Sequence, residues 1–227
     1  MEKKRIIIAI DGPAGSGKST TAKLLAQRLS FVYLDTGAMY RAVTLKALEN
    51  RIEPTDEKSL EKIAQDSRIE FKVQDGENKI FLDRRDVTEL IREPVIDEHV
   101  STVSKHKKVR EILVKMQREL SQKYDLVVEG RDISSVVFPQ ATVKIYLDAD
   151  LNERAKRRLK DLEKRKIFST LEEQKEKLAE RDRKDSKREI SPLLKHPDTQ
   201  IVDTTNLSIE KQVEEVLKIY RAGVSKI

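Results

Sequence analysis

The chain has 227 residues, of which 38% are charged and 37% are hydrophobic, and its 46 basic residues exceed its 40 acidic residues by six. It contains no cysteine, which excludes a disulfide framework, a thiolate metal site and a cysteine nucleophile. No apolar run reaches the length of a membrane-spanning helix, and the N-terminal residues lack the pattern of a signal peptide. We therefore expect one sizeable domain in a soluble, cytoplasmic protein.

Short apolar runs alternate with helix-period patterns along most of the chain, which predicts a parallel sheet with helices on both faces. The predicted core strands are 5–10, 31–34, 125–128, 142–147 and 200–202. The predicted helices are 19–29, 38–49, 94–121, 152–164, 171–187 and 208–222. The expected fold class is therefore α/β.

One segment breaks this alternation. Residues 69–73 and 79–83 have strand patterns and flank the turn-forming residues 74–78, and 84–88 is a candidate third strand. This pattern predicts a small antiparallel insert on the α/β core. The stretch 153–189 is rich in lysine, arginine and glutamate, so we expect it to be helical but weakly anchored, as suits a mobile flap.

The first predicted strand ends in a glycine-rich turn that opens into the first predicted helix. Residues 12–19 (Gly-Pro-Ala-Gly-Ser-Gly-Lys-Ser) fit the spacing G-x-x-x-x-G-K-[ST] at every constrained position. Glycines let successive N–H groups point at phosphate oxygens, and the helix adds its positive N-terminal end. Lys18 can then reach the β- and γ-phosphates, and the Ser19 hydroxyl can ligate Mg²⁺. The spacing thus predicts a phosphate-binding loop for a nucleoside triphosphate rather than a purely structural turn.

Two further polar stretches follow predicted strands, at the carboxyl edge where open α/β sheets bind ligands. Residues 35–37 (Asp-Thr-Gly) could cap the next helix or belong to a site, and the pattern alone favours the cap. Residues 129–132 (Glu-Gly-Arg-Asp) are hard to explain by solubility and indicate function. Residues 181, 185 and 188 share one helical face by spacing, although composition alone favours a solvated, charged helix there.

Together these stretches resemble the bacterial cytidylate kinases, which are nucleoside monophosphate kinases. The resemblance is carried by residues 10–19 (IDGPAGSGKS), 34–41 (LDTGAMYR), 129–132 (EGRD), 137–139 (VFP), 144–149 (KIYLDA), 181–188 (RDRKDSKR), 192–193 (PL) and 203–210 (DTTNLSIE). The first motif is generic, whereas 34–41 and 129–132, combined with 181–188, are specific. The resemblance implies a P-loop NTPase-type, five-stranded parallel sheet flanked by helices in a single kinase domain, 1–227. It also implies a monophosphate-binding insert at 63–102 and a helical lid at 157–190.

The resemblance further implies transfer of the γ-phosphoryl group of ATP to CMP or dCMP, with Mg²⁺ and no organic cofactor. The catalytic residues that it implies are Lys18, Arg131, Arg157 and Arg188. The implied ATP contacts are Gly12, Pro13, Ala14, Gly15, Ser16, Gly17, Lys18, Ser19, Thr20, Arg154 and Arg157, with Ser19 on the metal. The implied acceptor contacts are Thr36, Arg110, Asp132 and Arg188 for the base, Arg41 and Arg131 for the phosphate, and Ser101, Arg181 and Asp185 for the ribose. One departure is Glu129, where many relatives have the shorter aspartate.

The chemistry is consistent with this resemblance, because an acceptor that is already an anion needs no general base, only cations that offset the charge of two phosphates. We expect small-molecule partners, no nucleic acid or membrane partner, and a monomer. Three alternatives remain: a P-loop kinase of another specificity such as a uridylate kinase, a GTPase switch, and a nucleic-acid-binding ATPase. The sequence has no N-K-x-D guanine motif, and its interleaved charges and 4% aromatic residues offer no stacking platform for a nucleic acid. The preference between CMP and dCMP is left open.

Overall fold

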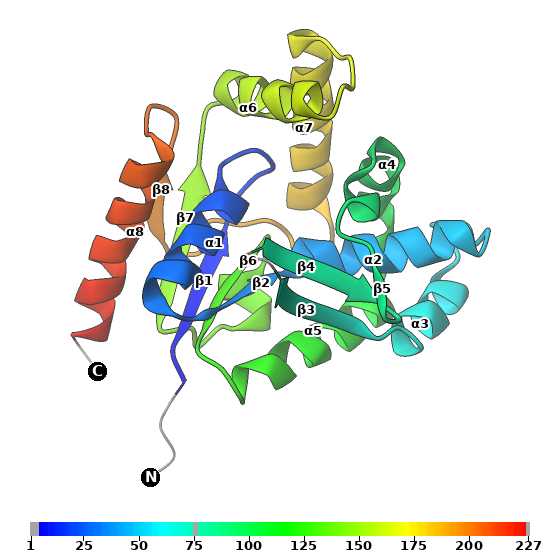
Figure 1. Ribbon diagram of the computed structural model, residues 1–227, viewed down its shortest axis with the longest axis horizontal. Coiled ribbons are helices and arrows are strands. Elements are labelled where there is room, and N and C mark those ends of the chain that lie inside the picture. The colour runs from blue at the N-terminus through cyan, green and yellow to red at the C-terminus, as the bar shows by residue number, and fades with distance from the viewer. Residues whose placement is uncertain (1–4, 75–76, 226–227) are drawn as a thin grey trace. The chain divides into compact units, whose positions relative to one another are not determined.

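A computed structural model describes residues 5–74 and 77–225 of the chain (Figure 1). The chain divides into two compact units, the first formed by residues 1–33 and 121–227 and the second by residues 34–120. Each unit has a hydrophobic core of its own. Within residues 5–74 and 77–225, no helix is both long and apolar enough to cross a membrane.

The elements alternate much as the sequence predicts. The strands are β1 (Ile7–Asp11), β2 (Val32–Asp35), β3 (Ile69–Gln74), β4 (Glu77–Leu82), β5 (Arg85–Asp86), β6 (Leu126–Gly130), β7 (Val143–Asp148) and β8 (Gln200–Asp203). The α-helices are α1 (Lys18–Leu29), α2 (Thr36–Glu49), α3 (Glu57–Gln65), α4 (Pro94–Val103), α5 (Lys107–Ser121), α6 (Leu151–Lys164), α7 (Leu171–Lys187) and α8 (Ile209–Val224). A 3₁₀ turn, η1 (Leu90–Arg92), and a π-helical turn, η2 (Ile133–Val137), complete the described elements.

The five-stranded sheet has the order β2-β6-β1-β7-β8, with β1 at its centre. β1 is parallel to both neighbours, and Asp11 at its end is in register with Gly130 of β6 and Tyr146 of β7. The edge strand β2 begins beside β6, because the Val32 N–H donates to the Asp125 carbonyl at 2.9 Å. The carboxyl ends of β1, β6 and β7 therefore meet at one edge, from which the loops of the first unit extend.

The core of the first unit forms around the apolar side chains of β1 and β7. Ile10 and Ile145 have no exposed surface, and they belong to the same cluster as Leu25 of α1 and Val213 of α8. Helices α1 and α8 present their apolar stripes to these strands. Helices α6 and α7 follow β7 and pack against each other (Figure 1).

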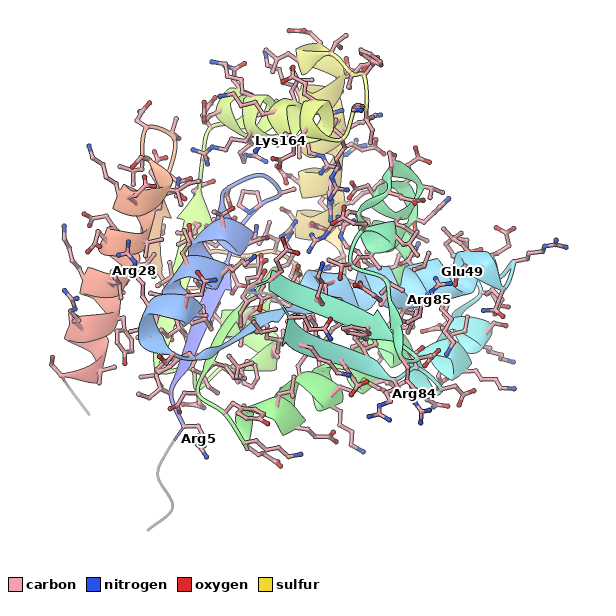
Figure 2. The ribbon with its side chains drawn as sticks, in the orientation of Figure 1. Arg5, Arg28, Glu49, Arg84, Arg85 and Lys164 are labelled. Carbon is pink, nitrogen blue, oxygen red and sulfur yellow. The ribbon has the colours of Figure 1, made fainter. Side chains whose placement is uncertain are left out.

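The core of the second unit joins α2 to a three-stranded antiparallel sheet of order β3-β4-β5. Ala38 and Ala42 of α2 cluster with Ile80 and Leu82 of β4. At the surface, Arg85 of β5 donates to Glu49 of α2 at 2.5 Å, and Figure 2 shows these two side chains side by side. The fold class that the sequence predicts is thus confirmed, including the small antiparallel sheet; residues 75 and 76 of its predicted turn lie outside the described residues.

The prediction of one middle helix over 94–121 is wrong in one respect. The segment forms two helices, α4 and α5, which are separated by residues 104–106. The Ser104 carbonyl accepts a hydrogen bond from the Arg110 guanidinium at 3.0 Å, and His106 Nε2 lies 2.8 Å from the Pro54 carbonyl oxygen. The backbone N–H groups of Lys105 and His106 donate to residues three positions earlier, so the α-helical pattern tightens into a turn there. No glycine or proline marks the break in the sequence, so periodicity alone runs through it.

Two smaller differences lie in the second unit. Helix α3 is absent from the predicted elements, although Asp56 caps it by accepting from the Ser59 N–H at 3.2 Å and Leu60 and Ile63 are buried. The candidate strand 84–88 shortens to the two residues of β5.

Candidate active site

The glycine-rich loop between β1 and α1 is shaped by close approach to its neighbours. Gly12 has φ +149°, and a Cβ there would lie 2.1 Å from the Leu147 carbonyl oxygen at the end of β7. Gly17 has φ +93°, and a Cβ there would lie 2.7 Å from Gln212 Oε1 of α8. The backbone conformation disfavours a larger residue at both positions, and at Gly12 the Leu147 backbone leaves no space for one. The loop therefore keeps one curled shape ahead of the positive N-terminal end of α1.

Lys18 lies within this loop and is buried. Its ammonium donates to the Pro13 carbonyl at 2.6 Å and to Ser16 Oγ at 3.4 Å. Burial and the positive charge of Arg131 lower the pKa of Lys18 to about 7, against the opposing effect of Glu129. A phosphate in the loop would reverse this effect, because it supplies the negative charge that the buried ammonium lacks.

Ser19 and Thr20, at the start of α1, are exposed. The Ser19 hydroxyl has no partner among the residues that the structure describes, so it is available to a ligand. No cluster of three or more histidine, cysteine, aspartate or glutamate side chains suited to hold a metal occurs within residues 5–74 and 77–225.

The stretch that follows β6 brings a cation and an anion to the same edge. Arg131 Nε donates to Asp185 Oδ2 of α7 at 2.9 Å. Burial alone would raise the pKa of Asp185, but Arg131, Arg181 and Arg188 hold it below its ordinary value. Asp132 is also buried, with Arg188 Nη2 3.9 Å from its Oδ1. Because Asp185 is buried among these arginines, the solvated-helix interpretation is wrong for this residue.

Arg188 reaches Asp132 by a different route from the one that spacing suggests. Helix α7 ends at Lys187, and Arg188 has extended backbone angles (φ −66°, ψ 141°). Its Nε donates to the Ser191 carbonyl in the turn that follows. The shared helical face of residues 181, 185 and 188 is therefore wrong for Arg188, which belongs to the turn after the helix.

Arg154 of α6 contacts the phosphate loop directly. Its Nη1 donates to the Ala14 carbonyl at 3.1 Å and to Asp182 of α7 at 2.6 Å, while its Nε donates to Ala149 at 2.9 Å. Its Cβ lies 3.0 Å from the place of a Cβ on Gly15. The Arg154 guanidinium therefore links the phosphate loop to both α6 and α7. The sequence analysis does not single out Asp182 for this contact.

Arg157, one turn further along α6, is held by residues beside the loop. Its Nε donates to Glu153 at 3.0 Å, and its two terminal nitrogens donate to Thr204 Oγ1 at 3.1 Å and to the Thr204 carbonyl at 2.6 Å. Thr204 follows β8, at the same edge of the sheet as the loop. Its place after a predicted strand is the signal that could have identified it.

Two acidic residues of the central strands have distinct settings. Asp11 accepts from the Ile133 and Ser134 N–H groups, each at 2.8 Å, and from the Ser134 hydroxyl at 2.6 Å. Burial raises the pKa of Asp11 despite these hydrogen bonds. Glu129 is buried, and the Tyr33 hydroxyl donates to its Oε1 at 2.8 Å. Asp11 thus fastens the phosphate loop to the turn after Asp132, and Tyr33 orients Glu129.

In the second unit, the cap interpretation of residues 35–37 is confirmed for Asp35. Asp35 accepts from the Ala38 N–H at 2.9 Å and so caps α2, whose first residue, Thr36, is buried. Arg92 also donates to Asp35 at 2.6 Å. Burial alone would raise the pKa of Asp35, but the positive charge of Arg92 holds it below its ordinary value. Arg92 is not among the residues that the sequence singles out.

The other predicted residues of this unit lie on α2, α4 and α5. Arg41 is buried on α2, where it donates to the Ile91 carbonyl at 3.1 Å and pairs with Asp97 of α4. Arg110 is buried on α5, and its guanidinium carbon lies 5.3 Å from the centre of the Tyr40 ring of α2. Ser101 is half-buried on α4, which packs against α2. Guanidinium groups match the geometry of carboxylates and phosphates, so Arg41 and Arg110 are the candidates in this unit to contact an anionic ligand.

The model of the cytidylate kinase family matches residues 8–222. The chain belongs to the cytidylate kinase family. A protein named cytidylate kinase from Bacillus cereus is 47% identical over 225 residues, which cover 98% of this chain and 99% of that protein. Another so named, from Bacillus anthracis, is 48% identical over 218 residues, covering 95% of this chain and 96% of its own.

A solved structure of an uncharacterized protein from Eubacterium ventriosum has a TM-score of 0.52 and 12% identity, and the match covers 94% of this chain and 97% of that one. This likeness concerns the fold alone. As a member of the cytidylate kinase family, the chain is an enzyme of the phosphotransferase class. The resemblance that its motifs suggest is thereby confirmed.

Proposed function

We propose that this cytidylate kinase family member transfers the γ-phosphoryl group of ATP to the 5′-phosphate of CMP, with dCMP as a second acceptor. An oxygen of the acceptor phosphate attacks the γ-phosphorus in line, and the bond to the β–γ bridging oxygen breaks, which gives CDP or dCDP and ADP. The observation that carries the proposal is the buried Lys18 in its glycine loop, next to the charge of Arg131, in a chain of this family.

On the donor side, the backbone N–H groups of the loop 12–20 would cradle the triphosphate, except at Pro13, which has no N–H. Lys18 would follow the γ-phosphate. Arg154 and Arg157 adjoin this loop and would offset the remaining charge. The exposed Ser19 hydroxyl fits a magnesium ion held mainly by substrate phosphates and water, since such sites require few protein ligands. Bound Mg²⁺ would neutralise developing charge on the phosphate oxygens.

On the acceptor side, the first unit would contribute Arg131 to the phosphate, Arg181 and Asp185 to the ribose, and Asp132 and Arg188 to the base. The second unit would contribute Arg41 to the phosphate, Ser101 to the ribose, and Thr36 and Arg110 to the base. The burial of Asp132 and Arg110 supports base reading, because desolvated polar groups discriminate most strongly between hydrogen-bond partners. We further propose that residues 63–102 form the acceptor insert and that 157–190 form a lid that keeps water from the reaction.

The test is a coupled assay of ADP formation with ATP and each of CMP, dCMP, UMP, AMP and GMP. We expect kcat/KM to be highest for CMP and dCMP. Lys18→Ala should lower kcat at least about 100-fold, the scale for one charged contact in the transition state, and should leave the circular dichroism spectrum unchanged. A preference for UMP would favour a uridylate kinase, and near-normal turnover by Lys18→Ala would reject the phosphate-loop assignment.

A further inference from the structure

Thr204 contacts three separate parts of the first unit. Its Oγ1 lies 2.9 Å from the Ser16 carbonyl oxygen of the phosphate loop and 2.9 Å from the Asp148 carbonyl oxygen at the end of β7. Arg157 Nη1 donates to the same hydroxyl at 3.1 Å, and Nη2 donates to the Thr204 carbonyl at 2.6 Å. Thr204 has no exposed surface, so water cannot replace any of these contacts.

We infer that Thr204 is a positioning residue for the triphosphate donor, an inference that rests on the proposed function. The carbonyl of Ser16 and the N–H of Gly17 belong to one planar, trans peptide unit, so they point in opposite directions. A hydroxyl that holds the Ser16 carbonyl on the Thr204 side therefore turns the Gly17 N–H away from Thr204. The loop needs its N–H groups to point inward at phosphate oxygens, and Thr204 holds this peptide in one orientation.

The same residue places Arg157. Two of the three guanidinium nitrogens donate to Thr204 and the third donates to Glu153, which leaves the side chain one orientation. In that orientation Nη1 lies 3.7 Å from the place of a Cβ on Gly17. Thr204 thus holds a cation against the loop at the peptide whose direction it also fixes.

The segment that follows Thr204 supports Gly17 from another element. Gln212 of α8 is buried, its Nε2 donates to the Leu207 carbonyl at 3.1 Å, and its Oε1 accepts from Thr21 at 3.0 Å. That Oε1 is the atom a Cβ on Gly17 would meet at 2.7 Å. The buried Gln212 side chain thus lies beside Gly17, so we expect a change in the direction of the Ser16–Gly17 peptide to alter donor binding.

Thr204→Val tests the inference, because valine keeps the shape of threonine and removes the hydroxyl. Thr204→Ser restores a hydroxyl, and Thr199→Val is the matched control, since the buried Thr199 hydroxyl has no hydrogen-bond partner among the described residues. The measurements are KM for ATP, KM for CMP, and the Kd of ADP by calorimetry. For Thr204→Val we expect KM for ATP and Kd for ADP to rise about tenfold, while KM for CMP changes less than twofold. For Thr204→Ser we expect KM for ATP and Kd for ADP within about threefold of the wild-type values. Thr199→Val should have the wild-type values.

An equal rise of both KM values in Thr204→Val, or the same loss in Thr199→Val, would overturn the positioning role. Should Thr204→Val fail to fold, Thr204→Ala fits the same space and takes its place with the same expected result. Failure of both to fold, with Thr199→Val stable, would assign Thr204 to the fold alone and overturn the inference. A wild-type protein that binds no ADP would instead reject the proposed function, whatever the variants do.

Discussion

Lys18 combines burial with a nearby positive charge, and this makes the phosphate loop sensitive to pH. With its pKa lowered to about 7 by burial and by Arg131, the lysine of the nucleotide-free loop is mostly neutral at pH 8. The unfolded chain keeps this proton up to about pH 10.4, so Lys18 makes the free energy of unfolding rise with pH between these values. A bound triphosphate would restore the ammonium, because it supplies a negative charge beside Lys18.

We therefore expect nucleotide binding at pH 8 to take up nearly one proton, and the affinity for ADP to fall as pH rises above 7. Calorimetric titration in two buffers of different ionisation enthalpy measures this uptake. Lys18→Met is the control, because it cannot take up the proton yet keeps the length of the side chain. Equal proton uptake by wild type and Lys18→Met would show that another group titrates.

Among the residues proposed to contact the base, Asp132 is the one whose chemistry best distinguishes cytosine from uracil. An ionised carboxylate only accepts hydrogen bonds, so it matches the N4 amino group of cytosine and repels O4 of uracil. Its burial and the 3.9 Å approach of Arg188 make the cost of a mismatched polarity larger than in water. We expect wild type to prefer CMP over UMP by about 10²–10⁴-fold in kcat/KM.

Asp132→Asn should lose CMP activity and narrow this ratio, since its amide can donate to O4. Measuring kcat/KM for both substrates in wild type and variant tests the expectation. A ratio that stays the same would mean that Asp132 does not contact the base.

At the scale of elements, α7 is connected to the rest of the first unit chiefly by charge. Asp182 pairs with Arg154 at 2.6 Å and Asp185 pairs with Arg131 at 2.9 Å, whereas few apolar side chains of α6 and α7 are buried, among them Ala155, Leu162 and Leu178. A bound phosphate could replace a carboxylate as the partner of either arginine, and movement of these helices would expose few apolar side chains. The helices of the proposed lid are therefore suited to open and close.

Hydrogen exchange should reveal this motion. We expect amides in 157–190 to exchange much more slowly with CMP and a non-hydrolysable ATP analogue together than in the free protein. Asp182→Asn should raise exchange of the free protein in 171–187, because the neutral amide no longer pairs with Arg154. If protection in this region is equally high without ligands, α6 and α7 are a rigid part of the fold and no gating occurs.

Those elements that depend on local pattern could be predicted from the sequence, and those that depend on tertiary partners could not. The strands of the parallel sheet and helix α7 lie within two residues of their predicted bounds, because their apolar periods and caps are local signals. The break between α4 and α5 has no such local signal. Its contacts involve Pro54, which is distant in the sequence, and Arg110, which does not follow Ser104 at a helical spacing. Asp182 has no local signal either, since its role depends on Arg154 of another helix, whereas the place of Thr204 after a predicted strand is a signal that could have identified it.

At the scale of the whole molecule, the charges are interleaved rather than gathered. Arg28 of α1 pairs with Glu214 of α8, and Lys144 of β7 pairs with Asp198 at 2.5 Å, so many surface cations have an anion beside them. This pattern does not indicate a continuous stripe of positive charge, which is what a protein uses to bind a nucleic acid backbone. Within each unit, the buried arginines instead gather around single carboxylates, as Arg131, Arg181 and Arg188 do around Asp185, which suits a small anion.

The stability of the whole chain depends on two hydrophobic cores and, under the proposed function, on two nucleotide ligands. A ligand that binds only the folded state stabilises it by RT ln(1 + [L]/Kd), about 2.7 kcal/mol at 100 times Kd, which corresponds to roughly 5–10 °C in Tm for a chain of this size. If the lid closes only when both nucleotides are bound, its closure adds contacts that neither ligand gains alone. We therefore expect CMP and a non-hydrolysable ATP analogue together to raise Tm by more than the sum of their separate shifts. Differential scanning calorimetry measures these Tm shifts. Lys18→Ala is the control, which should lose most of the Tm shift caused by the ATP analogue and keep the shift caused by CMP. Strictly additive Tm shifts in wild type would mean that the two nucleotides bind without a shared closing step.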